Sequence, residues 1–236
     1  MPDSLAPLRL EPFLSRPLWG GRLLSTDFGK GERGSLIGES WEVYASDRIV
    51  GGPYAGHTLD DVAARHAEAL LGSDGARNYT GTFPLLIKLI DAAQQLSIQV
   101  HPDDDQAHRL EHAPYGKTEA WHILHAEPGA KLIYGLRQSL SADELRDHAA
   151  SGQIEDDVKT IEVRSGDSVL VPAGTIHSIG GGILLYEVQE TSETTYRLYD
   201  WHRAGPDGKT RALHLDKAAM VANRGPATEN VRHVDS

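Results

Sequence analysis

The sequence of 236 residues contains no cysteine. This absence excludes disulfides, thiolate nucleophiles and cysteine-ligated metals, so any metal site would have to use nitrogen and oxygen donors. The sequence also lacks an apolar run that approaches the roughly 18 residues needed to span a membrane. Residues 1–4 include an acid and no basic stretch, so no signal peptide is expected. These absences predict a cytoplasmic protein without a membrane partner.

Positive charge is also scarce, because 23 Lys and Arg residues face 34 Asp and Glu residues, for a net charge of −11. A protein that binds the phosphate backbone of nucleic acids requires a basic face, so the charge balance argues against a nucleic-acid partner. What the sequence does have in excess is histidine, with 12 residues. A metal site built from imidazole and oxygen ligands is therefore the first possibility to examine.

Glycine (24 residues) and proline (12 residues) divide the sequence into short segments, which favours many short strands over a helical bundle. Apolar runs and alternating patterns predict strands over residues 83–92, 96–101, 118–124, 131–134, 168–171 and 183–189. Capping residues and apolar periodicity predict helices over residues 58–72, 103–112, 141–152 and 216–223. The chain is therefore predicted to be mainly β, a barrel or sandwich with a few helical insertions.

Three regions are predicted along the chain. Residues 1–80 are expected to form strands and one helix that pack on a barrel. Residues 81–222 are expected to form that barrel and to carry the chemistry. Residues 223–236 are polar and are predicted to form a flexible tail.

Alternation along two predicted strands brings polar side chains to one face. Ser97, Gln99 and His101 alternate with apolar residues, so they share a face of their strand. Lys117 and Glu119 share a face of another strand for the same reason. One face of the predicted barrel thus presents an imidazole, an amide oxygen, a carboxylate and a lysine.

A third polar group comes from the string GDSVLVPAGTIH at residues 166–177. A glycine, a strand, a proline and a second glycine turn the chain sharply and place His177 at the start of the returning strand. This string resembles the second cupin motif, G(x)5PxG(x)2H, and has every specified residue up to the histidine. Gly181 stands where that motif ends in asparagine. In the first cupin motif, Gln99-Val100-His101 stands where HxH is usual, and Glu119 follows after a helical insertion.

These departures resemble one branch of the cupins, the type I mannose-6-phosphate isomerases. That branch shows the strings LSxQVHPDD, GKTE, VPAGTxH and TTYRLYDW, which are similar to residues 96–104, 116–119, 171–177 and 194–201. The strings WGG and GESW at residues 19–21 and 38–41 resemble the opening of the same family. The resemblance covers about residues 10–222, and members of the family continue beyond it into a further β-domain.

The resemblance implies a cupin-type jelly-roll barrel that interconverts mannose 6-phosphate and fructose 6-phosphate through an enediol. It implies one Zn²⁺ per chain, held by Gln99, His101, Glu119 and His177. It also implies that Arg197 is the catalytic arginine and that Lys117 lies beside the phosphorylated hexose. Independently of the family, two imidazoles, one carboxylate and one amide oxygen form a reasonable set of ligands for zinc.

Several roles stay open at this point. Arg197 could instead pair with Asp200 or Glu190, and Lys117 could be a surface lysine beside a glycine turn. Ser97 could bind the sugar or its phosphate, or be an ordinary strand hydroxyl. The group that carries the proton is also open: a zinc-bound water, Lys117 and a nearby histidine all qualify. The oligomeric state is not predicted.

Two other classes of function compete with the isomerase. His101, Glu119 and His177 would also form the two-histidine, one-carboxylate triad of an iron or manganese oxidoreductase. A non-catalytic sugar-binding cupin is the third possibility. The combination of Gln99, Lys117 and Arg197 favours the isomerase over the oxidoreductase, whereas a sugar-binding cupin would bind its ligand without turnover.

Overall fold

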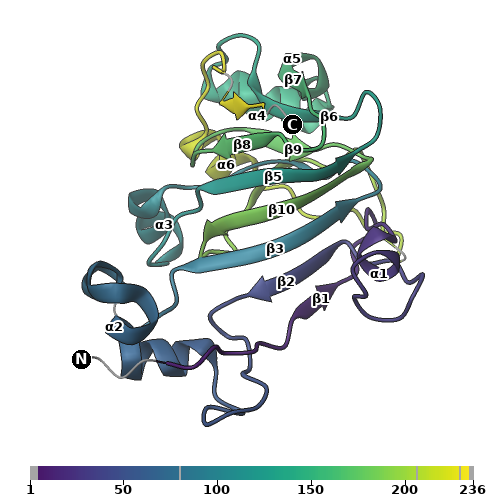
Figure 1. Cartoon of the computed structure of the whole chain (residues 1–236). Coiled ribbons are helices and arrows are strands. Elements are labelled where there is room, and N and C mark those ends of the chain that lie inside the picture. Colours follow the sequence, from purple (N-terminus) through teal and green to yellow (C-terminus); the bar gives the residue numbers. More distant parts are fainter. Residues whose placement is uncertain (1–4, 80, 206, 229, 234–236) are drawn as a thin grey trace.

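The computed structural model describes residues 5–79, 81–205, 207–228 and 230–233. Its strands form two antiparallel sheets, shown in Figure 1. The larger sheet has seven strands in the order β1 (Phe13–Ser15), β2 (Glu39–Val43), β3 (Leu85–Ala92), β10 (Ile183–Glu190), β5 (Glu119–Ala126), β8 (Ser168–Val171) and β12 (Val231–Arg232). The smaller sheet has five strands in the order β11 (Tyr196–Tyr199), β4 (Ile98–Val100), β9 (His177–Ile179), β6 (Lys131–Leu136) and β7 (Val158–Glu162). The mainly β prediction is confirmed.

The two sheets pack against each other through apolar side chains that alternate along their strands. Both sheets contribute to this core, whose buried members include Ile90, Trp121, Ile123, Leu132, Tyr134, Ile161, Val169, Ile179, Ile183 and Leu185. The other face of the smaller sheet is covered by helices through a second cluster, which includes Ile98, Val100, Ile133, Leu145, Ala149, Leu198, Ala218 and Val221. The interior is thus apolar except where the strands present the polar groups described below.

The helices are α1 (Leu23–Thr26), α2 (Leu59–Asn78), α3 (Asp104–Glu111), α4 (Ala142–Ser151), α5 (Ile154–Asp157) and α6 (Leu215–Val221). The predicted helices are confirmed as α2, α3, α4 and α6, and capping boxes begin the first three of these. The predicted stop at Gly72 is confirmed as an interruption of α2, which has a second helical segment beyond it. Gly72 adopts a φ of 73°, which kinks the helix, but helical hydrogen bonding resumes and continues to Asn78. Within the described residues, none of the helices is long and apolar enough to cross a membrane.

The N-terminal part extends the larger sheet. β2 pairs with β3 in the register Glu39↔Ile90, and β1 pairs with β2, so both strands continue the sheet past β3 (Figure 1). Asp91 at the end of β3 accepts a hydrogen bond from the backbone N–H of Leu23 at 2.6 Å and so holds the start of α1. This packing places Glu39 and Trp41 next to β3.

The predicted division into residues 1–80, 81–222 and 223–236 stays a prediction. In the predicted tail, β12 pairs with β8 through Val231↔Val169, and Ala227 packs against the core between the sheets. Residues 1–4 and 80 of the first region, and 229 and 234–236 of the last, lie outside the described residues.

Candidate metal centre and active-site cavity

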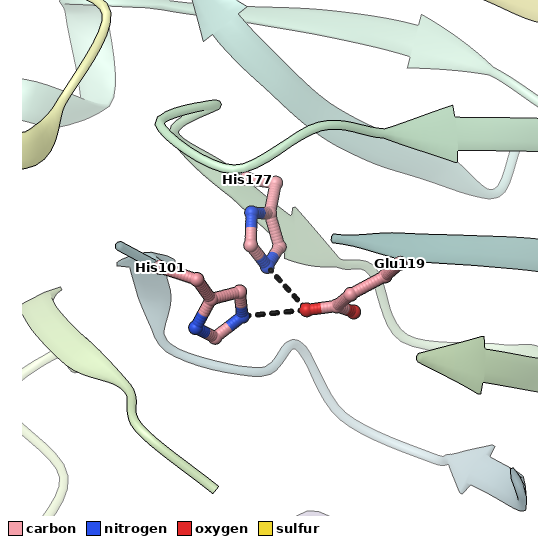
Figure 2. Close-up of side chains that lie close together, drawn as sticks. All are labelled: His101, Glu119 and His177. Atoms are coloured by element: carbon pink, nitrogen blue, oxygen red, sulfur yellow. Dashed lines mark ion pairs between the residues drawn. The ribbon is translucent and has the colours of Figure 1, made fainter. Parts of the chain in front are cut away.

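Three buried side chains converge at one end of the space between the sheets (Figure 2). His101 follows β4, Glu119 begins β5 and His177 begins β9. Each is about 1% exposed, and one potential ligand atom from each lies within 4.8 Å of the others. Oε1 of Glu119 is 2.5 Å from Nε2 of His101 and 3.6 Å from Nε2 of His177. The structure thus brings together three of the four predicted metal ligands from separate parts of the sequence.

Backbone geometry explains this convergence. β4 pairs with β9 in the register Gln99↔His177, so the two strands present these side chains side by side. The turn before β9 needs Gly174, whose φ of 82° is favoured only for glycine. The N–H of Gly174 donates to the carbonyl of His101 at 2.8 Å, which links the turn to the end of β4. The string of glycine, proline and histidine noted in the sequence therefore fixes where His177 begins.

Hydrogen bonds to backbone carbonyls fix which nitrogen of each imidazole faces the cluster. Nδ1 of His101 lies 2.9 Å from the carbonyl of Thr194, and Nδ1 of His177 lies 2.8 Å from the carbonyl of Thr175. A carbonyl can only accept, so both Nδ1 atoms must carry hydrogen. Burial lowers the pKa of His101 to about 3 and also lowers the pKa of His177, so both rings are neutral. Each Nε2 therefore offers a lone pair, as a metal-binding histidine requires.

Glu119 is ionised despite its burial. Burial acts to raise its pKa, but the positive charge of Lys117, whose Nζ lies 3.3 Å from Oε1, outweighs burial and holds the pKa of Glu119 well below the usual range. Its other oxygen, Oε2, accepts a hydrogen bond from Nε1 of Trp121 at 3.0 Å. Oε1 of Glu119 and Nε2 of His101 are buried without a hydrogen-bond partner. A carboxylate oxygen and imidazole lone pairs that face one another fit a bound cation.

Gln99, the fourth predicted ligand, reaches the same cluster. Its Nε2 lies 3.3 Å from Nε2 of His177, so the amide would have to turn to direct Oε1 towards a metal. The hydroxyl of Ser97 lies 3.4 Å from Oε1 of Gln99. The polar face predicted for this strand is confirmed, whereas the role of Gln99 as a ligand stays a prediction.

A cavity of about 340 Å³ opens beside the cluster. Among its lining residues are Ser97, Gln99, Lys117 and Arg197, so the structure gathers the predicted substrate-binding residues at one place. Lys117 is 5% exposed and is therefore no ordinary surface lysine. Arg197 donates from Nε to Oγ of Ser97 at 3.3 Å and from Nη1 to the carbonyl of Ala212 at 3.0 Å.

Asp200 and Glu190, the two carboxylates considered as alternative partners of Arg197, bind other groups. Asp200 forms ion pairs with Arg203 and Arg211, at 2.6 Å and 2.5 Å from their Nη2 atoms. Glu190 accepts a hydrogen bond from the backbone N–H of Thr118 at 2.7 Å. Arg197 is therefore held by Ser97 and a backbone carbonyl, and it lines the cavity.

The cavity also contains charged residues that the sequence reasoning missed. Lys88 on β3 and Glu187 on β10 are direct neighbours in the sheet, and Nζ of Lys88 lies 3.4 Å from Oε1 of Glu187. Oε2 of Glu187 accepts a hydrogen bond from Nε1 of Trp121 at 2.8 Å. Burial, together with the negative charge of Glu119, raises the pKa of Glu187 to about 8. Arg211, which also lines the cavity, adds a second guanidinium beside Arg197.

The signal for two of these residues was present in the sequence. Lys88 is the single charge within the apolar run of residues 85–90, and Glu187 lies within the apolar stretch of residues 183–188. A charge in the middle of a buried strand needs a partner of opposite charge, so each of these residues indicated that such a partner lies on a neighbouring strand. Arg211 lies in a polar stretch and offered no such signal.

Comparison with known proteins identifies one family. The family described as "Phosphomannose isomerase type I, catalytic domain" matches residues 9–122. The probable mannose-6-phosphate isomerase GmuF of Bacillus subtilis is 41% identical over 219 residues, which cover 91% of this chain and 68% of that protein. The mannose-6-phosphate isomerase of Streptococcus mutans is 39% identical over 224 residues, with 93% and 68% covered.

A solved structure is also similar. The mannose 6-phosphate isomerase from Bacillus subtilis superposes with a TM-score of 0.85 at 34% sequence identity, over 98% of this chain and 72% of that one. This likeness confirms the predicted cupin-type fold. The chain therefore belongs to the type I phosphomannose isomerases, a family of enzymes of the isomerase class.

Proposed function

We propose that this chain is a metal-dependent isomerase that interconverts mannose 6-phosphate and fructose 6-phosphate. The observation that carries the proposal is the buried cluster of His101, Glu119 and His177, which Lys117 and Gln99 connect to a cavity that Arg197 also lines. The names of the most similar relatives supply the substrate. The cluster supplies a place where a cation can meet the sugar oxygens.

The proposed metal is Zn²⁺, held by His101, Glu119 and His177, with Gln99 as a fourth ligand after its amide turns. Two neutral imidazoles, one carboxylate and one amide oxygen suit zinc without cysteine. When bound, the metal would polarise the sugar carbonyl and hold the neighbouring oxygen. The hydrogen bonds from both Nδ1 atoms to backbone carbonyls support this arrangement, because they fix the tautomers.

The proposed phosphate site lies at the arginine end of the cavity. Arg197 and Arg211 both line it, and burial followed by the charge of Arg211 lowers the pKa of Arg197. Two guanidinium groups at one end of a cavity suit a phosphate group, because each can bind its oxygens through paired hydrogen bonds. Asp200 fixes Arg211 through two hydrogen bonds, at 2.7 Å and 2.5 Å, so Arg211 is held in place before a substrate arrives. Ser97 can donate a further hydrogen bond.

The isomerisation needs one carbon-bound proton to move. In the open-chain aldose, a base removes the proton from C2 to give an enediol, the same proton is delivered to C1, and the hydroxyl proton passes from O2 to O1. We assign the transfer of the carbon-bound proton to the carboxyl group of Glu187, because this residue lines the cavity and its pKa, raised to about 8, is close to the pH at which a group can both take up and release a proton. Lys88 holds that carboxyl group from the neighbouring strand. Lys117 faces the oxygen on which negative charge develops.

A coupled assay tests the proposal. The purified chain would be given mannose 6-phosphate, and the formation of fructose 6-phosphate would be measured before EDTA, after EDTA and after Zn²⁺ is returned. We expect turnover that disappears with chelation and returns with zinc. No turnover with zinc bound would contradict the isomerase and favour a sugar-binding role, whereas oxygen uptake with bound iron would favour an oxidoreductase.

A further inference from the structure

The loop between β10 and β11, residues 191–195, touches the metal centre through its backbone. The carbonyl of Thr194 accepts the hydrogen bond from Nδ1 of His101 at 2.9 Å, and Thr195 lines the active-site cavity. The position of this carbonyl decides how the imidazole of His101 is turned. The orientation of a predicted metal ligand therefore depends on what holds the loop.

Gln189 holds the loop from inside the protein. Its side chain is 1% exposed, and its Nε2 donates to the carbonyls of Ser192 at 2.7 Å and Glu190 at 3.0 Å. Oγ of Ser192 in turn accepts from the backbone N–H of Thr194 at 3.3 Å. Oε1 of Gln189 is buried without a hydrogen-bond partner. An amide that stabilises two loop carbonyls while its own oxygen stays unpaired is costly, which indicates that the loop geometry matters.

Tyr44 holds the loop from outside. Its hydroxyl donates to Oε1 of Glu193 at 2.7 Å and joins two segments that are 149 positions apart. Tyr44 is itself fixed, because its N–H donates to Asp47 at 2.7 Å and its ring packs edge-on against Trp41 at 5.2 Å. Glu193 lies between two hollows: it lines both the active-site cavity and a second one of about 580 Å³ that Tyr44 also lines. The hydrogen bond between Tyr44 and Glu193 therefore connects the loop to the N-terminal part of the chain beside the cavity.

We infer that Tyr44 is a positioning residue for His101, acting through Glu193 and the carbonyl of Thr194. Gln189 supports the same loop from its buried side. This inference rests on the metal site proposed above. It gives the N-terminal part of the chain a role in metal binding, although Tyr44 touches none of the proposed ligands.

The test is the affinity for Zn²⁺, measured by competition with a chromophoric chelator. Tyr44→Phe removes only the hydroxyl that holds Glu193. Removing a direct partner of a metal-binding histidine typically weakens binding about tenfold to a hundredfold, and because Tyr44 acts one step further away we expect about threefold to tenfold. Glu193→Gln keeps an acceptor oxygen and should lose less affinity than Glu193→Ala.

Tyr199→Phe is the matched control. Tyr199 donates to Oε1 of Glu155 at the same distance of 2.7 Å, but this bond connects β11 to α5 and not to the loop. Both tyrosine variants should lower the unfolding temperature by similar amounts, and only Tyr44→Phe should weaken zinc binding. With Co²⁺ in place of Zn²⁺, the visible spectrum, which reports ligand geometry, should shift in Tyr44→Phe alone.

The outcomes separate this inference from the proposed function. If the unmodified chain binds zinc and both tyrosine variants bind it equally well, with unchanged cobalt spectra, the positioning role of Tyr44 is wrong and the metal site stands. If the unmodified chain takes up neither Zn²⁺ nor Co²⁺, the proposed metal site itself is wrong, and the role of Tyr44 falls with it.

Discussion

Nε2 of His101 lies 2.5 Å from Oε1 of Glu119, and both atoms are buried without a hydrogen-bond partner. Because Nδ1 of His101 carries the ring hydrogen, this contact brings a lone pair against a carboxylate oxygen. Two such acceptors repel each other in a buried site. A cation between them would turn the repulsion into attraction, and this relationship motivates the first prediction.

Zinc should stabilise the folded chain. A ligand that binds only the native state at a thousandfold excess over its dissociation constant adds about 4 kcal/mol to the free energy of unfolding. Thermal unfolding with and without Zn²⁺ measures this gain. Glu119→Gln removes the carboxylate charge and should abolish most of the response.

His148→Ala provides the control for the zinc response. His148 pairs with Asp157 at 2.7 Å, a second contact between a histidine and a carboxylate that lies outside the cluster. The zinc response of this variant should match that of the unmodified chain. An equal loss of response in both variants would mean that zinc binds elsewhere or without specificity.

The buried pair of Lys88 and Glu187 should show strong coupling. At pH 9, above the pKa of about 8 of Glu187, Lys88→Met leaves an ionised carboxyl group without its partner in a buried site, which typically costs about 3–5 kcal/mol. The double variant Lys88→Met/Glu187→Gln removes both charges and should lose much less stability than the two single variants added together. Urea unfolding of all four proteins completes the cycle. Additive losses would show that the two side chains do not depend on each other.

Much of the architecture was predictable because it depends on local patterns. The three capping boxes begin helices where the sequence places them, at Thr58, Asp103 and Ser141. The strand predicted at residues 168–171 is confirmed with the same limits. Gly72 interrupts the helix as predicted, whereas the helical segment that follows it to Asn78 was not predicted.

The site was predictable only in part, for a physical reason. His101, Glu119 and His177 lie in recognisable strings, so their convergence followed from the resemblance and the strand alternation. The pairing of Lys88 with Glu187 depends on which strands become neighbours, because β3 and β10 are separated by about ninety residues of sequence. Local periodicity says nothing about such neighbours, and the charge within each strand was the only hint.

Arg211 should matter for the phosphate group of the substrate. Arg211→Gln removes one of the two guanidinium groups at the arginine end of the cavity, and the loss of a charged hydrogen bond costs about 1.5–3 kcal/mol. We expect KM for mannose 6-phosphate to rise roughly tenfold to a hundredfold with a smaller effect on kcat, and inhibition by inorganic phosphate to weaken in parallel.

Arg203→Gln is the matched control for Arg211. Arg203 binds the same carboxylate, Asp200, at 2.6 Å, but it is not among the residues that line the cavity. KM should change little in this variant. If both variants raised KM equally, the effect would come from the loss of partners around Asp200 and not from a contact between Arg211 and the phosphate.

The last prediction concerns the dependence of stability on pH near Asp47. Burial raises the pKa of this carboxyl group from 3.8 to about 6, against the lowering effect of the hydrogen bond from the N–H of Tyr44. Between these two pH values the folded state binds more protons than the unfolded state, so the contribution of Asp47 to stability falls as pH rises from about 4 to about 6 and stays unfavourable above that. Asp47→Asn keeps an acceptor for Tyr44 and removes the charge.

Asp47→Asn should therefore raise the free energy of unfolding at pH 8 by on the order of 2 kcal/mol, and the gain should vanish near pH 4. The charge of Asp61 has the opposite effect on stability and stabilises the folded state, because hydrogen bonds from the backbone and side chain of Thr58 lower its pKa. Asp61→Asn should lose stability at pH 8, and this loss should shrink as pH falls below 4. Urea unfolding at pH 8, near pH 4 and below pH 4 checks the two signs. A pH-independent gain for Asp47→Asn would show that the benefit comes from packing, because only an effect of the charge disappears when the carboxyl group is protonated.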